Sequence, residues 1–261
     1  MRHDFCYISK DDPEVKKAYN DIKNILKEVQ KLLREEFTLR FDVVGSYKIN
    51  MITYDAKSNV GFDFDFNIEI NADYDEYSPK ELKNMLQNAI GKVCIKYGYD
   101  YPEDSTRVLT IKKKDRKKSC ILHSCDFAIV NNYIDDEGYE GQEYIRHNKA
   151  RRNYTWCEQS DGYYMLPDKI DWIKGNNLWN AVRDLYIKKK NQNDDPNMHS
   201  RTILAITVHE ICQRYGFYEN EKIQQSESCP FGKKVEIPLY GNSPVRILGL
   251  PRQNYTSISL F

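Results

Sequence analysis

The sequence predicts an α+β protein in which a β-sheet is backed by helices and followed by a mainly helical region. Residues 61–70 alternate strictly between apolar and polar side chains, as a strand with one buried face does. Residues 13–37 and 79–93 instead repeat apolar side chains at helical spacing, and so do 176–190 and 201–215 in the second half of the chain.

Composition limits the classes of function. The chain has 261 residues, enough to bury a sizeable core, and its 39 basic residues balance 39 acidic ones, so no overall positive field draws it to nucleic acid. The seven cysteines include no Cys-x-x-Cys pair and predict reduced thiols. Because the chain shows no apolar signal-peptide core and no run of about eighteen apolar residues, we expect a cytoplasmic protein without a membrane span.

The first helix is a long amphipathic one of about six turns. Asp12 is a suitable N-cap, and Pro13 suits the first helical position. The helix leads into an apolar, strand-like run from Phe41 to Val44. Further on, Ser78 and Glu81 match a capping box that opens a second helix, which Gly98 closes.

Residues 107–111 and 120–130 predict a β-hairpin. The basic stretch that joins them, 112–118, is favoured as a solvated turn, with a site for RNA or polyphosphate as the minority interpretation.

The polar face of the strand at 61–70 carries the first candidate site residues. Alternation places Asp63 and Asp65 side by side on the face opposite the phenylalanines. Two adjacent carboxylates repel each other, and a shared divalent cation removes the repulsion. An ordinary solvated strand face is the competing interpretation. Gly45-Ser46 favours the metal site, because this pair follows an apolar strand and could open a helix whose amides bind phosphate.

Asp126 is the candidate third acid. It lies in a largely apolar strand at 119–130, where an ionised carboxylate is costly unless it is paired or bound to a metal. The alternative is a strand-end aspartate that caps a turn. Two metals over a nucleotidyl-transferring centre normally need three acidic ligands from neighbouring strands.

In this order, Gly45-Ser46, Asp63-x-Asp65 and Asp126 resemble the DNA polymerase beta-like nucleotidyltransferases. The pattern is most similar to the branch that contains oligoadenylate synthetase, cyclic GMP-AMP synthase and the bacterial cyclic-oligonucleotide synthases. The motifs span roughly residues 41 to 130. One departure is a longer spacer between Ser46 and Asp63, so residues 53–60 are expected to form an extra turn or flap.

The resemblance implies a catalytic core with a mixed central sheet at 1–137, braced by the first helix, and a mainly helical substrate lobe at 138–261. It implies a magnesium- or manganese-dependent enzyme that moves a nucleoside monophosphate from a nucleoside triphosphate to a hydroxyl. Asp63, Asp65 and Asp126 would bind the metals, and Asp126 is a candidate general base. The nucleotide-binding candidates that the resemblance implies are Gly45, Ser46, Lys188, Lys189 and Ser200.

The acceptor is left open, with a cyclic or linear oligonucleotide favoured by the resemblance. Basic and aromatic residues are interleaved from Arg146 to Trp156, which suits a nucleotide or RNA as well as it suits an irregular packed segment. The rival function is a catalytically silent nucleotide-binding module of the same fold, acting as a sensor or antitoxin-like partner. Residues 217–261 indicate no role.

Overall fold

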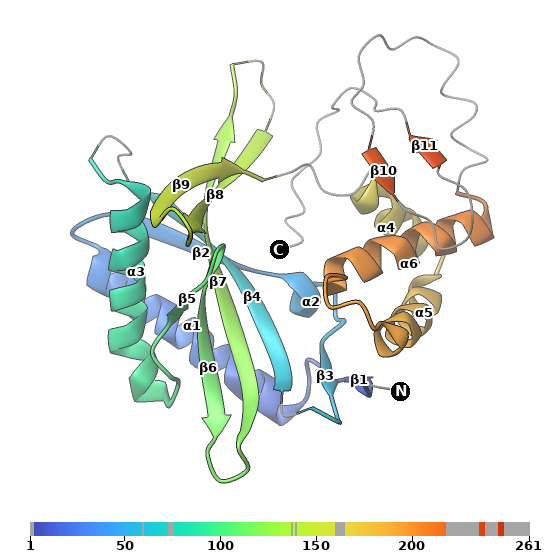
Figure 1. Cartoon of the computed structure of the whole chain (residues 1–261), viewed down its shortest axis with the longest axis horizontal. Coiled ribbons are helices and arrows are strands. Elements are labelled where there is room, and N and C mark those ends of the chain that lie inside the picture. The colour runs from blue at the N-terminus through green and yellow to red at the C-terminus, as the bar shows by residue number, and fades with distance from the viewer. Residues whose placement is uncertain are drawn as a thin grey trace. The chain divides into compact units, whose positions relative to one another are not determined.

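The computed structural model describes residues 3–58, 60–72, 76–136, 138, 140–159, 165–217, 235–237 and 245–247 (Figure 1). The described residues fall into two compact units, the first of which ends at Gln159. The sequence placed the division at 137/138 instead. Residues 73–75 lie outside the described residues, as does most of the segment after 217.

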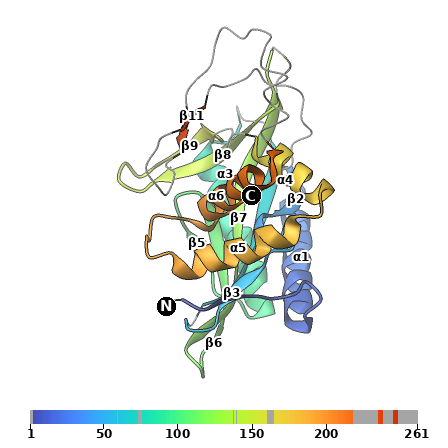
Figure 2. The ribbon, with the colours of Figure 1, turned by 90° about the vertical axis from the view of Figure 1, so that its right-hand side faces the viewer.

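The first unit is built on one twisted mixed sheet (Figures 1 and 2). Its strands run in the order β2-β4-β7-β6-β5, and β8 pairs with the far end of β7 and with β9. Only the pairing of β4 with β7 is parallel among the pairings described for this sheet. The strands are β2 (Thr38–Val44), β4 (Val60–Asn71), β5 (Glu103–Asp104), β6 (Val108–Asp115), β7 (Cys120–Ile134), β8 (Glu140–Asn148) and β9 (Asn153–Glu158). The predicted α+β class is confirmed.

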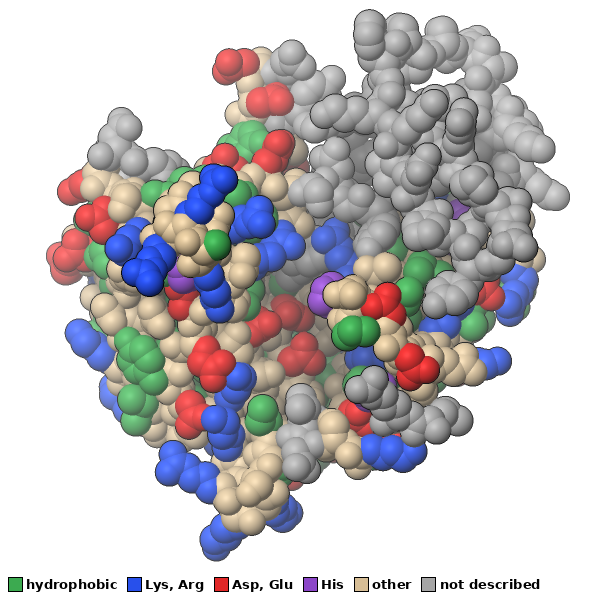
Figure 3. Space-filling model, in the orientation of Figure 1, with side chains coloured by type: hydrophobic (Ala, Val, Ile, Leu, Met, Phe, Trp, Pro, Cys, Tyr) green, Lys and Arg blue, Asp and Glu red, His purple; other side chains and the backbone are tan. Residues whose placement is uncertain are grey.

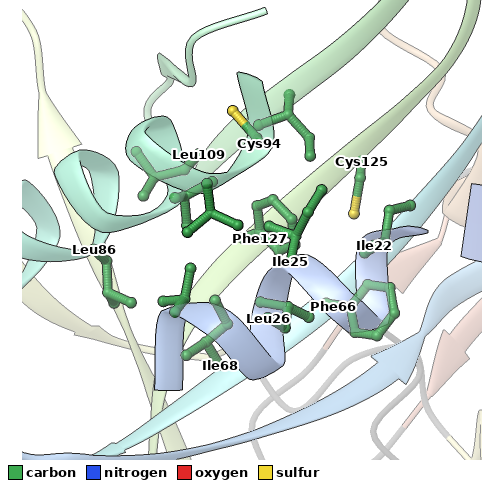
Figure 4. Close-up of a cluster of buried hydrophobic side chains, with 14 of the residues drawn as sticks. Ile22, Ile25, Leu26, Phe66, Ile68, Leu86, Cys94, Leu109, Cys125 and Phe127 are labelled. Atoms are coloured by element: carbon green, nitrogen blue, oxygen red, sulfur yellow. The ribbon is translucent and has the colours of Figure 1, made fainter. Parts of the chain in front are cut away.

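Helices α1 (Pro13–Leu33) and α3 (Pro79–Cys94) pack against the apolar face of this sheet. Figure 4 shows Ile25 and Leu26 of α1 with Phe66 of β4 and Phe127 of β7 in one cluster. All four side chains are at most 2% exposed. The alternation in β4 thus has the predicted consequence: its phenylalanines enter the core and its carboxylates face away.

Both predicted helix starts are confirmed. The Asp12 side chain accepts hydrogen bonds from the amides of Glu14 and Val15 at the start of α1. Ser78 and Glu81 form the full capping box of α3. After α3, a single 3-10 turn (Ile95–Tyr97) ends at Gly98 in the left-handed conformation.

The spacer between Ser46 and Asp63 is a short strand followed by a turn. Strand β3 (Thr53–Asp55) pairs with β1 (Phe5–Tyr7) in a separate two-stranded sheet. The buried Asp55 carboxylate accepts hydrogen bonds from the amides of Asp4 and Lys57. The expected extra turn is therefore present only after β3, whereas β3 itself pairs with the N-terminal strand β1.

The basic stretch 112–118 is only in part a turn. Lys112, Lys113 and Lys114 belong to β6. Lys112 and Lys114 pair with carboxylates of Glu103 and Asp100 at 2.5 and 2.6 Å. The solvated turn is confined to the residues after Asp115, and the first three lysines are part of strand β6.

The second unit contains three helices among its described residues. They are α4 (Leu166–Gly175), α5 (Trp179–Gln192) and α6 (Ser200–Tyr215). The sequence predicted α5 and α6 but not α4. Two short strands, β10 (Val235–Ile237) and β11 (Val245–Ile247), pair antiparallel. None of the helices in the described part of the chain is both long and apolar enough to cross a membrane.

Candidate active site

Asp65 and Asp126 are directly opposite each other in the sheet. They are register partners in the parallel pairing of β4 with β7, so their side chains leave the sheet on the same face. Asp63 precedes Asp65 by two residues and shares that face. The structure therefore brings the three predicted acids together on two neighbouring strands.

The three carboxylates repel one another. Burial, together with the negative charges of Asp63 and Asp126, raises the pKa of Asp65 to about 8. Burial also raises the pKa of Asp126, as does Asp63, while a hydrogen bond from Thr110 acts in the opposite direction. A cation would stabilise a group of neighbouring acids with these properties.

Gly45 lies against one of these acids. It has a φ of +64°, and a Cβ added there would lie 2.1 Å from Asp65 Oδ2. Both the left-handed backbone and the close approach require glycine at this position. Gly45 begins α2 (Gly45–Lys48), a single helical turn, so the predicted helix after the Gly-Ser pair is confirmed but short.

Ser46 follows at the same turn. Its Oγ is buried and has no hydrogen-bond partner among the described residues. Its carbonyl accepts a hydrogen bond of 2.8 Å from the Met51 amide, which fixes the turn. A buried hydroxyl without a partner is costly, and a bound ligand with acceptor oxygens would satisfy it.

Thr110 is a site residue that the sequence reasoning missed. It lies opposite Asp126 in the antiparallel pairing of β6 with β7, and its Oγ1 donates to Asp126 Oδ1 at 2.5 Å. The positive charge of Lys112, two residues further along β6, lowers the pKa of Asp126. The only signal in the sequence that Thr110 belongs to the site is the alternation that places Thr110 and Lys112 on the polar face of β6.

The donor set suits Mg²⁺ or Mn²⁺, because carboxylate oxygens are the ligands that these ions prefer. As the side chains stand, no group of three or more His, Cys, Asp or Glu in the described residues is arranged to hold a metal ion. The raised pKa of Asp65, the close approach of Gly45 and the partnerless Ser46 hydroxyl all fit a site that is completed by a cation and a phosphate.

The chain is similar over part of its length to several solved structures. No family model and no curated protein sequence matches the chain. The GTP-bound Vibrio cholerae DncV is similar over 76% of this chain and 51% of its own, with 16% identity and a TM-score of 0.46. The Elizabethkingia meningoseptica cyclic dinucleotide synthase CdnE, with GTP and Apcpp, is similar over 77% and 70%, with 14% identity and a TM-score of 0.48. The chain thus spans about half the length of DncV.

DncV is described as a cyclic AMP-GMP synthase and a prokaryotic cGAS homolog.

Lys188, Lys189 and Ser200 belong to the second unit. Lys188 is exposed near the end of α5, whereas Lys189 pairs with Glu210 of α6 at 2.8 Å. Ser200 is the exposed first residue of α6. Their binding roles remain predictions from the resemblance.

Proposed function

We propose that the protein is a metal-dependent nucleotidyltransferase that moves a nucleoside monophosphate from a nucleoside triphosphate to a hydroxyl and releases pyrophosphate. The observation that carries the proposal is the register of Asp65 with Asp126, with Asp63 on the same face and Gly45 against Asp65. This arrangement brings three acids together, and a bound cation would stabilise their ionised forms.

Asp63 and Asp65 would hold Mg²⁺ or Mn²⁺, and Asp126 would complete the donor set. The bound metal would neutralise charge on the triphosphate and on the departing pyrophosphate. Asp126 is held by Thr110 through one carboxylate oxygen, which leaves the other oxygen to accept the proton of the attacking hydroxyl. The Ser46 hydroxyl would donate to a phosphate oxygen, and Gly45 lets the backbone approach it.

The acceptor that we propose is the one that the family resemblance favours. It would be the hydroxyl of a second nucleotide or of RNA, so that the product is a cyclic or linear oligonucleotide. By the same resemblance, Lys188, Lys189 and Ser200 would contact the triphosphate.

The proposal is tested by measuring pyrophosphate release from each of the four ribonucleoside triphosphates with Mg²⁺ or Mn²⁺. Asp63→Asn and Asp126→Asn should abolish release without unfolding the protein. Asp42→Asn is the matched control, because Asp42 is an exposed acid on the neighbouring strand β2. Full release in both site variants would end the proposal. Nucleotide binding without release and without a metal effect would instead support the silent binding module.

A further inference from the structure

The hairpin of β8 and β9 has two different faces. On the inner face, Ile145 is register partner to Trp156, and His147 to Tyr154. Ile145 is fully buried, and Tyr154 and Trp156 pack against the core. The alternation of the strands therefore turns Arg146 and its partner Thr155 outward.

Polar contacts fix the hairpin on the rest of the unit. Asp104 of β5 receives the Tyr154 hydroxyl at 2.7 Å and lies 3.0 Å from His147 Nδ1. The same carboxylate pairs at 2.8 Å with Lys83 of α3, which is 1% exposed. In addition, the His147 amide donates to the Thr106 carbonyl at 2.8 Å. Because four elements meet at Asp104, the outer face of the hairpin is held in one orientation.

The outer face and the tip of the hairpin carry positive charges that have no ion-pair partner in the described part of the chain. These residues are Arg146, Lys149, Arg151 and Arg152, all exposed. We call this set the basic hairpin. In Figure 3, blue side chains gather over the turn between β8 and β9, and others surround the β6–β7 tip at the bottom. At Lys112 and Lys114, by contrast, carboxylates neutralise the basic residues.

An aromatic platform lies beside the basic hairpin. The guanidinium carbon of Arg107 is 4.1 Å from the centroid of the Tyr144 ring. Arg107 also donates to Gln159 Oε1 at 2.6 Å, so its position is fixed. From Tyr144 to Asn148, β8 extends about 13 Å, which is the reach of a short stretch of oligonucleotide.

We propose that the basic hairpin and the Arg107–Tyr144 pair bind single-stranded nucleic acid. Phosphates pair with the arginines and the lysine, which attract them without having to break internal ion pairs. An unpaired base stacks on the Arg107–Tyr144 platform, which a base inside a duplex cannot reach. The chain as a whole has no net charge, so the attraction is local to this surface.

The test is fluorescence anisotropy of a labelled oligouridylate with the full chain, without nucleoside triphosphate or divalent metal. For four phosphate contacts, affinity should fall roughly fifty-fold between 50 and 200 mM salt. Arg151→Glu combined with Arg152→Glu should reduce that fall to about sevenfold or less, because two contacts are lost and two repelling charges are added, and should weaken binding at low salt. The double variant should melt at the wild-type temperature, because both side chains are exposed.

Lys117→Glu with Lys118→Glu is the matched control, two exposed basic residues at the β6–β7 tip. The proposal predicts that this control binds as the wild type does. An equal loss in the control would overturn it. So would binding of duplex RNA or inorganic polyphosphate as tightly as the oligouridylate. Because no triphosphate is present, failure here is separate from failure of the proposed enzymatic activity.

Discussion

Replacing Asp65 by Asn should make the metal-free protein more stable, although the proposed activity is lost. Asp65 has its pKa raised from 3.8 to about 8 by burial and by its two acidic neighbours. Between these values the folded chain holds a proton that the unfolded chain has already released. Stability contributed by this site therefore falls as pH rises, by about 1.4 kcal/mol per pH unit. Asn carries no charge and avoids this loss.

The quantity to measure is the difference in free energy of unfolding between Asp65→Asn and the wild type. It should grow in favour of the variant by about 3 kcal/mol between about pH 5 and pH 7. A difference is needed because His123, with its pKa lowered to about 4 by burial, has the opposite effect. Below about pH 6.5 the unfolded chain protonates this histidine while the folded chain keeps it neutral, so stability falls as pH falls. Subtraction removes that contribution.

The assay is urea denaturation in the presence of a chelator at several pH values, with Asp42→Asn as the exposed control. The control should follow the wild type at every pH. Adding Mn²⁺ should stabilise the wild type and narrow its gap from Asp65→Asn, because the ion favours ionised Asp65. A gap that is independent of pH, or a variant that loses stability relative to the wild type as pH rises, would refute the reasoning.

Two further substitutions test the surroundings of Asp65 and Asp126. Gly45→Ala should cost about 2–5 kcal/mol of stability, because of the left-handed φ and the contact with Asp65. In the control Gly175→Ala, the added Cβ meets nothing within 4 Å, so stability should change by less than about 0.5 kcal/mol. Equal denaturation midpoints for the two variants would contradict this prediction. Thr110→Val should weaken Mn²⁺ binding roughly ten- to hundred-fold, as measured by titration calorimetry. Thr110→Ser should bind Mn²⁺ as the wild type does, because the serine hydroxyl can still donate to Asp126. Unchanged affinity in Thr110→Val would show that this hydrogen bond does not position Asp126.

Local signals in the sequence were sufficient for the elements that frame the site. The N-cap at Asp12 and the alternation around Asp63 and Asp65 are each determined by residues within a few positions. The expectation that Asp126 joins Asp63 and Asp65 came from the family resemblance, and the register of Asp65 with Asp126 comes from the structure. Composition and periodicity alone do not specify a parallel register between strands far apart in the chain.

Other features depend on tertiary contacts or on weak patterns. Thr110 can be assigned to Asp126 only when the antiparallel register of β6 and β7 is known. The β8–β9 hairpin turns His147 and Tyr154 inward, toward Asp104, so its inner face does not look apolar in the sequence. Helix α4 is short and starts at Leu166-Pro167 without a side-chain cap, so the usual start signal is missing.

The most direct test of the central claim uses nucleoside triphosphates labelled at the α-phosphate, incubated with the protein and Mg²⁺ and then treated with phosphatase. The proposed transfer predicts a labelled product that resists phosphatase, because its phosphate lies in a phosphodiester, and that is absent with Asp126→Asn. If the wild type and Asp126→Asn yield the same phosphatase-resistant product, the three carboxylates do not form the catalytic centre.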